Sequence, residues 1–178
     1  TTVASGPDPS VSICTVNNDG SLSHCRVTGN LSEAEGITLN SNNTFAYVTQ
    51  TDANQVASCV VNSDGRLGTC TFTANSLGPV ALAVSGSYLY SADYGDFFGT
   101  TVSSSLINSN GSLQPIIVAA NGFSSPGGIA INQAGTIAYV TNNSSNAVSM
   151  CTVAGASLTG CASTGSGFSS PFAVVIAD

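Results

Sequence analysis

Apolar residues occur along this chain in short stretches, and clusters of Gly, Asn and Ser separate one stretch from the next. Short apolar runs bounded by such turn residues are typical of β-strands. Where the pattern is clearest, we expect strands at 129–132, 137–142, 147–153 and 158–164. The pattern therefore predicts an all-β chain built from short strands.

The pattern of strands occurs four times. Val56–Cys70 matches Val11–Cys25 closely and Val148–Cys161 more loosely, and a further copy begins at Val102. Corresponding positions are separated by 45, 46 and 46 residues; they are Cys14, Cys59, Ser105 and Cys151. A constant spacing of this length is typical of repeat proteins in which each unit packs against its neighbours.

A second shared stretch precedes the repeated hairpin. Gly36–Gln50 matches Gly128–Asn142, and each contains Ala-Tyr-Val-Thr after a Gly-Ile-x-Leu/Ile-Asn strand. These residues resemble the family of YVTN β-propeller repeats, and the resemblance covers nearly the whole chain. It implies a four-repeat β-propeller-like domain of four-stranded antiparallel blades. Members of the family resemble seven-bladed rings and are often secreted or attached to a surface.

The repeats divide one domain, residues 1–178, into units at about 36–80, 81–127 and 128–172, and a split unit of 173–178 plus 1–35. The end of the chain resembles a first strand without a second. The beginning resembles a second strand, with Thr2–Gly6 aligned to Tyr139–Asn143. We expect the two ends to pair within one molecule, or else between copies. The expected contact residues are Val174, Val175, Ile176, Thr2 and Val3.

The six cysteines form three local pairs, each flanking a hairpin: Cys14 with Cys25, Cys59 with Cys70, and Cys151 with Cys161. If Asp19-Gly20 and Asp64-Gly65 form two-residue type I′ turns, the first two pairs lie opposite each other. A three-residue loop, 155–157, does the same for the third. Zinc is a poor alternative because the spacing is too long and only one His is present. Disulfides are therefore predicted, with no metal or cofactor.

The charge of the chain excludes several partners. Charged residues make up 6%, the net charge is −7, and the basic groups are Arg26, Arg66 and His24. No patch can neutralise nucleic acid or an anionic membrane. No apolar run approaches the roughly 20 residues of a membrane span. Disulfides and a start at Thr1, as after removal of a signal peptide, predict a secreted, extracellular or cell-surface protein.

Residues suited to catalysis are scarce. His24 is expected on a surface strand, and the nearest carboxylate pair, Glu33 and Glu35, in a solvated loop. Propeller lactonases resemble the predicted fold in outline, but their chemistry uses charged residues in a central channel. The positions expected to face such a channel here are apolar or small. The sequence therefore predicts that the chain is not an enzyme.

One loop departs from its repeat, and it combines aromatic and acidic residues: Asp93, Tyr94, Asp96, Phe97 and Phe98. Aromatic rings beside carboxylates suit a sugar or a protein partner, and the acids suit Ca²⁺. Local packing on the neighbouring blade is the other interpretation of this loop.

The hypothesis from sequence alone is a non-enzymatic extracellular structural or adhesive module. It would assemble as a filament or surface-layer subunit through its terminal strands, with self-association or an extracellular protein or glycan as its partner. The alternative is a small lectin-like carbohydrate-binding protein that uses the 94–98 loop. A lactonase-type enzyme ranks third.

Overall fold

The computed structural model describes residues 2–5, 11–29, 31–75, 77–95 and 99–177, with the side chains of 2–5 left out. They form fifteen strands in four antiparallel sheets. The N-terminal sheet contains β1 (Thr2–Ser5), β2 (Val11–Val16) and β3 (Leu22–Thr28). The second contains β4 (Ala34–Leu39), β5 (Phe45–Gln50), β6 (Gln55–Val61) and β7 (Leu67–Ala74).

The third sheet contains β8 (Pro79–Ser85), β9 (Tyr88–Asp93), β10 (Thr101–Leu106) and β11 (Ile117–Asn121). The fourth contains β12 (Pro126–Ile131), β13 (Ile137–Asn142), β14 (Ala147–Ala154) and β15 (Ser157–Thr164), with one 3-10 turn, η1 (Asn143–Ser145). The prediction of four-stranded antiparallel repeats is confirmed, and the four strands expected in the last repeat match β12 to β15 within a few residues.

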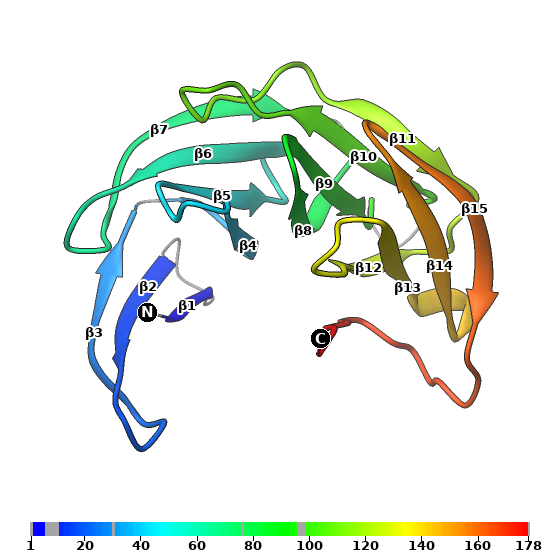
Figure 1. The fold of residues 1–178 in the computed structure, drawn as a ribbon, viewed down its shortest axis with the longest axis horizontal. Helices are drawn as coiled ribbons and strands as arrows, with labels where there is room; N and C mark the ends of the chain where they lie inside the picture. The colour runs from blue at the N-terminus through cyan, green and yellow to red at the C-terminus, as the bar shows by residue number, and fades with distance from the viewer. Residues whose placement is uncertain (1, 6–10, 30, 76, 96–98, 178) are drawn as a thin grey trace.

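The four sheets lie side by side along an open arc, with β4, β8 and β12 on its inner side and β7, β11 and β15 on its outer side (Figure 1). Three clusters of buried side chains each join neighbouring sheets. Val11 and Val48 belong to the first cluster, Tyr47 and Leu82 to the second, and Tyr90, Ile129 and others to the third. Burial of these faces between sheets is what stabilises the arc, because each sheet has too little apolar surface to fold alone.

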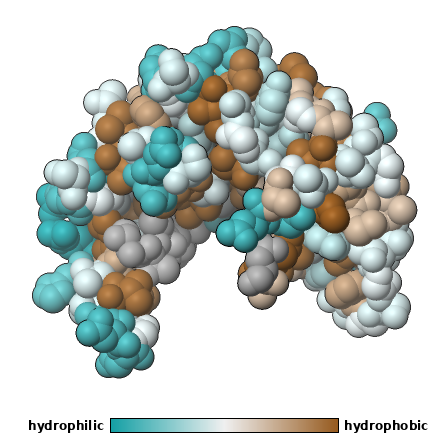
Figure 2. All heavy atoms as spheres, in the orientation of Figure 1, coloured by the Kyte–Doolittle hydropathy of each residue, from teal (hydrophilic) through white to brown (hydrophobic). Residues whose placement is uncertain are grey.

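The two ends of the chain lie at opposite sides of the opening of the arc (Figure 1), and the arc is open there in the space-filling view (Figure 2). The expected pairing of the terminal strands within one molecule is therefore not formed. The alignment of the first strand was also wrong by one residue. Thr2 lies opposite Cys14 as Ala138 lies opposite Cys151, so Thr2–Ser5 corresponds to 138–141.

The C-terminal segment, 171–177, lies beside β12 as β8 lies beside β4. A Cβ atom placed on Gly36 would lie 2.9 Å from the Cα atom of Ala81, and one on Gly128 would lie 3.0 Å from the Cα atom of Ala173. Both positions need glycine because the neighbouring backbone is too close for a side chain. Residues 171–177 (PFAVVIA) also match β8 (PVALAVS). The segment therefore lies where the first strand of a further sheet would begin.

The three predicted disulfides are present, with Cα atoms 4.0, 4.0 and 4.1 Å apart. The turns behind the prediction were wrong. The hairpin that contains Cys14 and Cys25 has a three-residue loop, 18–20. The hairpin that contains Cys151 and Cys161 has a two-residue loop, 155–156. A bulge between each loop and its disulfide shifts the register by one residue, and His24 and Gly160 have positive φ there. The bulge restores the pairing that the loop length alone would have broken.

The disulfides indicate an oxidising compartment, such as the extracellular space or a periplasm. In the described part of the chain, no helix is long and apolar enough to cross a membrane.

Buried tyrosines connect neighbouring sheets. The Tyr47 hydroxyl of β5 donates a hydrogen bond to the Gly111 carbonyl in the hairpin of the third sheet, at 3.2 Å. The Tyr90 hydroxyl of β9 donates in the same way to Gly155 in the hairpin of the fourth sheet. Each tyrosine thus anchors the hairpin of the next sheet along the arc.

These two tyrosines are expected to ionise late in an alkaline titration. Burial raises the pKa of Tyr47 and of Tyr90 to about 12, from an ordinary value of 10.0. Because the folded pKa is raised, the stabilising contribution is complete below pH 10 and is lost as pH rises through about 12. Phenolate absorbance should therefore still increase near pH 12, and Tyr47→Phe should remove part of that late step. A titration already complete at pH 11 in the folded protein would contradict this.

Candidate functional site on the concave face

The inner strands of the three complete sheets and the C-terminal segment border a hollow of about 220 Å³ on the concave face of the arc. Backbone and small or aliphatic side chains form most of its wall, from Gly36, Ile37, Val80, Ala81, Leu82, Gly127, Gly128, Ile129, Phe172, Ala173 and Val174. Glu35 supplies the ionisable group of this wall. The expectation of small and apolar residues facing the centre thus holds except at this glutamate.

A bulge in β4 sets the position of Glu35. Ala34 lies opposite Gln50 and Ile37 opposite Val48, so the register shifts between them and Glu35 and Gly36 fall in the bulge. The Gly36 amide donates a 2.7 Å hydrogen bond to the Thr49 hydroxyl instead of to the strand ladder. Bulges of this kind redirect a side chain next to a site, and here the redirected side chain is that of Glu35.

Two more carboxyl groups lie beside Glu35. Glu33 precedes β4 with a φ of 47°, and Asp52 follows β5. The Thr51 amide donates to the Glu33 carbonyl at 3.4 Å, which holds the two connections together. Pairing of β4 with β5 therefore brings Asp52 to the pair Glu33 and Glu35 that the sequence singled out. Asp52 was missed from sequence, although it lies only two residues after the repeated stretch Gly36–Gln50.

The three carboxyl groups interact. The main cause that raises the pKa of Glu33 is the hydrogen bond that its protonated carboxyl group donates to the Asp52 side chain, followed by partial desolvation and the negative charges of Asp52 and Glu35. Desolvation raises the pKa of Glu35, and a hydrogen bond with the Thr51 side chain opposes it. Two carboxyl groups form such a hydrogen bond only while one of them holds a proton, and all three side chains are exposed to solvent. The cluster can therefore both accept and donate a proton, as acid–base catalysis requires.

A larger hollow, of about 550 Å³, lies between the turns at the other ends of β4, β8 and β12. Its polar lining groups are hydroxyls and amides, from Thr38, Ser41, Ser85, Asn132 and Gln133. No described residue that lines it is ionisable. This hollow can offer hydrogen bonds to a polar molecule but supplies no group for proton transfer.

The loop that departs from its repeat begins with a buried carboxyl group. Asp93 has no exposed surface and accepts hydrogen bonds from Asn75, Ser91, Thr101 and Ser103. Burial raises its pKa, and the four hydrogen bonds oppose that shift. Asp93 therefore has no surface to offer to a ligand in this state.

Of the remaining candidate residues in this loop, the structure describes Tyr94 alone. The Tyr94 ring meets the Phe172 ring edge to face, with centroids 5.6 Å apart, which is the local packing considered from sequence. Asp96, Phe97 and Phe98 lie outside the described residues. A binding role for the loop stays a prediction.

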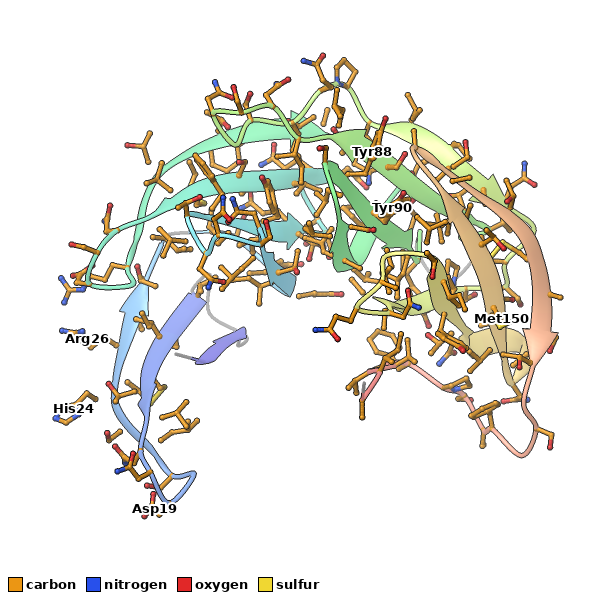
Figure 3. All side chains as sticks on the ribbon, in the orientation of Figure 1. Asp19, His24, Arg26, Tyr88, Tyr90 and Met150 are labelled. Carbon is orange, nitrogen blue, oxygen red and sulfur yellow. A yellow bond between two sulfur atoms is a disulfide. The ribbon has the colours of Figure 1, made fainter. Side chains whose placement is uncertain are left out.

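The basic residues lie away from the concave face. His24 and Arg26 project from β3 on the outer side of the arc (Figure 3), and the His24 side chain is exposed, as expected. Arg66 lies in the hairpin between β6 and β7, 3.6 Å from Asp64. No described residue provides a cation in either hollow. Among the described residues, no group of three or more His, Cys, Asp or Glu side chains is arranged to hold a metal ion.

Solved structures with the same arrangement establish the fold. A candidate 6-phosphogluconolactonase from Bacteroides fragilis aligns over 96% of this chain and 52% of its own, with a TM-score of 0.72 and 16% identity. The fold is that of a β-propeller. The periplasmic gluconolactonase of Pseudomonas aeruginosa aligns over 86% of this chain and 47% of its own, with a TM-score of 0.68 and 16% identity. The chain thus spans about half the length of these propellers.

A third propeller, virginiamycin B lyase from Staphylococcus aureus, has a TM-score of 0.54 and 15% identity over 85% of this chain and 47% of its own. No family model matches the sequence. No curated protein matches it either. At these identities the similarity shows the fold alone.

The comparison overturns the hypothesis drawn from sequence. The propellers with a named activity are mostly enzymes, lactonases and lyases, and not structural, adhesive or lectin-like modules. The exclusion of enzymes was wrong for the same reason. It rested on the scarcity of histidine and on the expectation that the pair Glu33 and Glu35 lies in a solvated loop. The fold also places Asp52 beside this pair, and Glu35 borders the hollow of the concave face.

Proposed function

We propose that this chain forms part of a propeller enzyme that hydrolyses a small, uncharged cyclic ester at the concave face. The main support is the carboxyl cluster of Glu33, Glu35 and Asp52, in which Glu35 borders the central hollow and Glu33 shares a hydrogen bond with Asp52. The names of the gluconolactonase and 6-phosphogluconolactonase neighbours support the choice of a lactone as substrate class.

Charge favours an uncharged lactone over a phosphorylated one. A phosphate group is normally bound by Arg, Lys or a helix N-terminus. The chain has two basic residues of this kind, Arg26 and Arg66, and neither borders either hollow. The carboxyl cluster and the net charge of −7 would repel an anion.

The reaction needs one base and one acid. A carboxylate of the cluster takes a proton from water, and the water oxygen attacks the carbonyl carbon of the lactone. The bond between that carbon and the ring oxygen then breaks, and the ring oxygen takes up the proton held by Glu33. Lactone and water thus become one hydroxy acid. The raised pKa of Glu33 suits it to hold a proton closer to neutral pH than an ordinary glutamate.

Release of acid from glucono-δ-lactone, recorded with a pH indicator and corrected for spontaneous hydrolysis, tests this function. We expect Glu35→Gln and Glu33→Gln to lower the enzymatic rate about 100-fold or more, since general acid–base groups contribute at least that factor. Asp64→Asn is the matched control, because Asp64 is an exposed acid at a hairpin tip. A rate no higher than the spontaneous one, or equal losses in all three variants, would reject the proposal.

We also propose that the protein is secreted or exposed at a cell surface and belongs to the YVTN-type propellers. The disulfides support the first point, and the two Ala-Tyr-Val-Thr stretches support the second. The periplasmic location named for the Pseudomonas lactonase agrees with an oxidising compartment.

A further inference from the structure

The larger hollow lies where three neighbouring turns differ in length. The turn between β4 and β5 has four residues, 41–44, and the turn between β12 and β13 also has four, 133–136. The turn between β8 and β9 has only two, 86–87. The short middle turn leaves a space between its longer neighbours, and the hollow of about 550 Å³ occupies that space.

The hollow is a property of three complete blades. Its lining residues come from the turns of three consecutive four-stranded sheets, and they lie between Thr38 and Gly135 in the sequence. The terminal segments of the chain contribute nothing to its wall. The hollow therefore does not depend on where the given sequence begins or ends.

Hydrogen bonds fix the shape of the two longer turns. Asn40 Oδ1 accepts from the backbone amides of Thr44 and Phe45, at 2.8 and 3.0 Å. Asn132 Oδ1 accepts from the corresponding amides of the other turn, at 2.9 and 3.0 Å. An asparagine that caps its own turn in this way restrains the backbone. The walls of the hollow are thus formed in advance, which lowers the entropy cost of binding a ligand.

The middle turn is braced differently. Ser85 has the position of the two asparagines, because it is the last residue of β8 and lies opposite Tyr88. Its hydroxyl donates a 3.3 Å hydrogen bond to the Gly135 carbonyl of the next turn. A Cβ atom at Gly135 would lie 2.7 Å from the Ser85 Oγ atom, so this close approach requires glycine. The Ser85 oxygen can still accept a hydrogen bond from a ligand.

Two hydroxyl groups of the wall have no hydrogen-bond partner among the described residues, and they belong to Thr38 and Ser41. Thr38 lies opposite the tyrosine of its sheet, where the next two sheets have Ala83 and Ala130. The hydroxyl of Thr38 is therefore an addition to the repeat at the one place where it borders the hollow. Each free hydroxyl can both donate and accept a hydrogen bond.

The chemistry of the wall selects an uncharged ligand. No described lining residue is ionisable, and Leu39, Val84 and Ala134 add apolar surface. A charged molecule would lose hydration here without gaining a counter-charge. A neutral molecule with several hydroxyl groups can exchange hydrogen bonds with the wall while its C–H groups contact the apolar side chains. The volume is within the range of about 300–1,000 Å³ that is usual for small-molecule sites.

We propose that this hollow binds a small neutral polyol. The hydroxyls of Thr38, Ser41 and Ser85 bind hydroxyl groups of the ligand, and Leu39 and Val84 contact its carbon skeleton. The site goes beyond the proposed hydrolysis, because it lies at the opposite ends of the inner strands from Glu35 and uses none of the three carboxyl groups.

Titration of the ¹⁵N-labelled 178-residue chain with glucose, a cyclic polyol, and with sorbitol, a linear one, tests the site. We expect saturable shifts of the backbone amides at 38–41, 84–86 and 132–135, and the compound that saturates at the lower concentration identifies the preferred form. Glucuronate, the charged analogue of glucose, should bind about 10-fold more weakly, because no charge balances its carboxylate. The absence of saturable shifts with both polyols would overturn the proposal, as would tighter binding of glucuronate.

Variants test which groups bind the polyol. Thr38→Val with Ser41→Ala removes both free hydroxyls and should raise the Kd about 10-fold, since two hydrogen bonds are lost. Ala134→Trp, at an exposed turn residue, should abolish binding because the ring fills the hollow. Thr69→Val, at an exposed threonine of β7, is the matched control and should leave the Kd unchanged. An unchanged Kd in the double variant would overturn the assignment. Lactone hydrolysis is a separate readout, so binding without turnover would reject the proposed function and support this site.

Discussion

Replacing Tyr47 by alanine is expected to lower the free energy of unfolding by about 3–5 kcal/mol, the range for removing a large aromatic side chain from a core. The Tyr47 side chain has no exposed surface and packs in the cluster that joins the second and third sheets, with Val56, Leu82, Leu89 and Leu113. It also carries the hydrogen bond to Gly111. A loss of this size is a large share of the roughly 5–15 kcal/mol that stabilises most domains. Urea denaturation followed by circular dichroism would measure it.

Two further variants separate the contributions at this position. Tyr47→Phe removes the hydroxyl alone and is expected to cost about 1 kcal/mol. Tyr139→Ala, at the half-buried counterpart, should lower the free energy of unfolding less than Tyr47→Ala does. Equal losses at the two tyrosines would mean that packing between sheets does not set the stability of the arc.

Replacing Asp93 by alanine is expected to cost about 3 kcal/mol at pH 5. The change leaves the Asn75 amide and three hydroxyl groups without their acceptor inside the third sheet, and unsatisfied buried donors are costly. Asp93→Asn should cost much less. Its amide oxygen can still accept from Asn75 and Ser91, while the hydroxyls of Thr101 and Ser103 can rotate to accept from its NH₂ group.

The difference in stability between Asp93→Asn and the wild type is also expected to depend on pH. Burial raises the pKa of Asp93, so the folded state holds its proton more tightly than the unfolded state, whose pKa is near 3.8. The stabilising contribution is therefore complete below pH 3.8 and is lost as pH rises through the folded pKa. The stability of Asp93→Asn relative to the wild type should accordingly improve between pH 4 and pH 7. A difference that stays constant over this range would show that Asp93 titrates normally.

The corresponding positions of the other sheets explain why this acid is tolerated. Gln50 and Asn142 end β5 and β13 where Asp93 ends β9, and both are buried amides. Asn142 donates to the Val140 carbonyl and the Ser149 hydroxyl, and it accepts from the Ser124 amide. A polar group at this position thus secures the connection to the next strand. Asp93 fits because four donors converge on it.

Much of the fold could be predicted from the chain itself. The spacing of Cys14, Cys59, Ser105 and Cys151 revealed the repeat, and the apolar stretches located the strands of the last sheet within a few residues. Local chemistry determines these features, since strand pattern and turn residues act over short distances. The disulfide pairing was also predicted, although both loop lengths used to derive it were wrong. The bulges that restored it depend on the cross-strand fit of the sheet.

Only the tertiary structure decided the shape of the whole and the candidate site. Strand patterns describe each blade but not the angle between successive blades, so the sequence did not decide between an open and a closed ring. The packed sheets form an open arc. Glu33 and Glu35 are neighbours in sequence, yet their chemistry depends on Asp52, which the pairing of β4 with β5 brings to them. The full burial of Tyr47 and Tyr90 and the partial burial of Tyr139 are likewise properties of the assembled arc, because burial between sheets exists only once the sheets have packed.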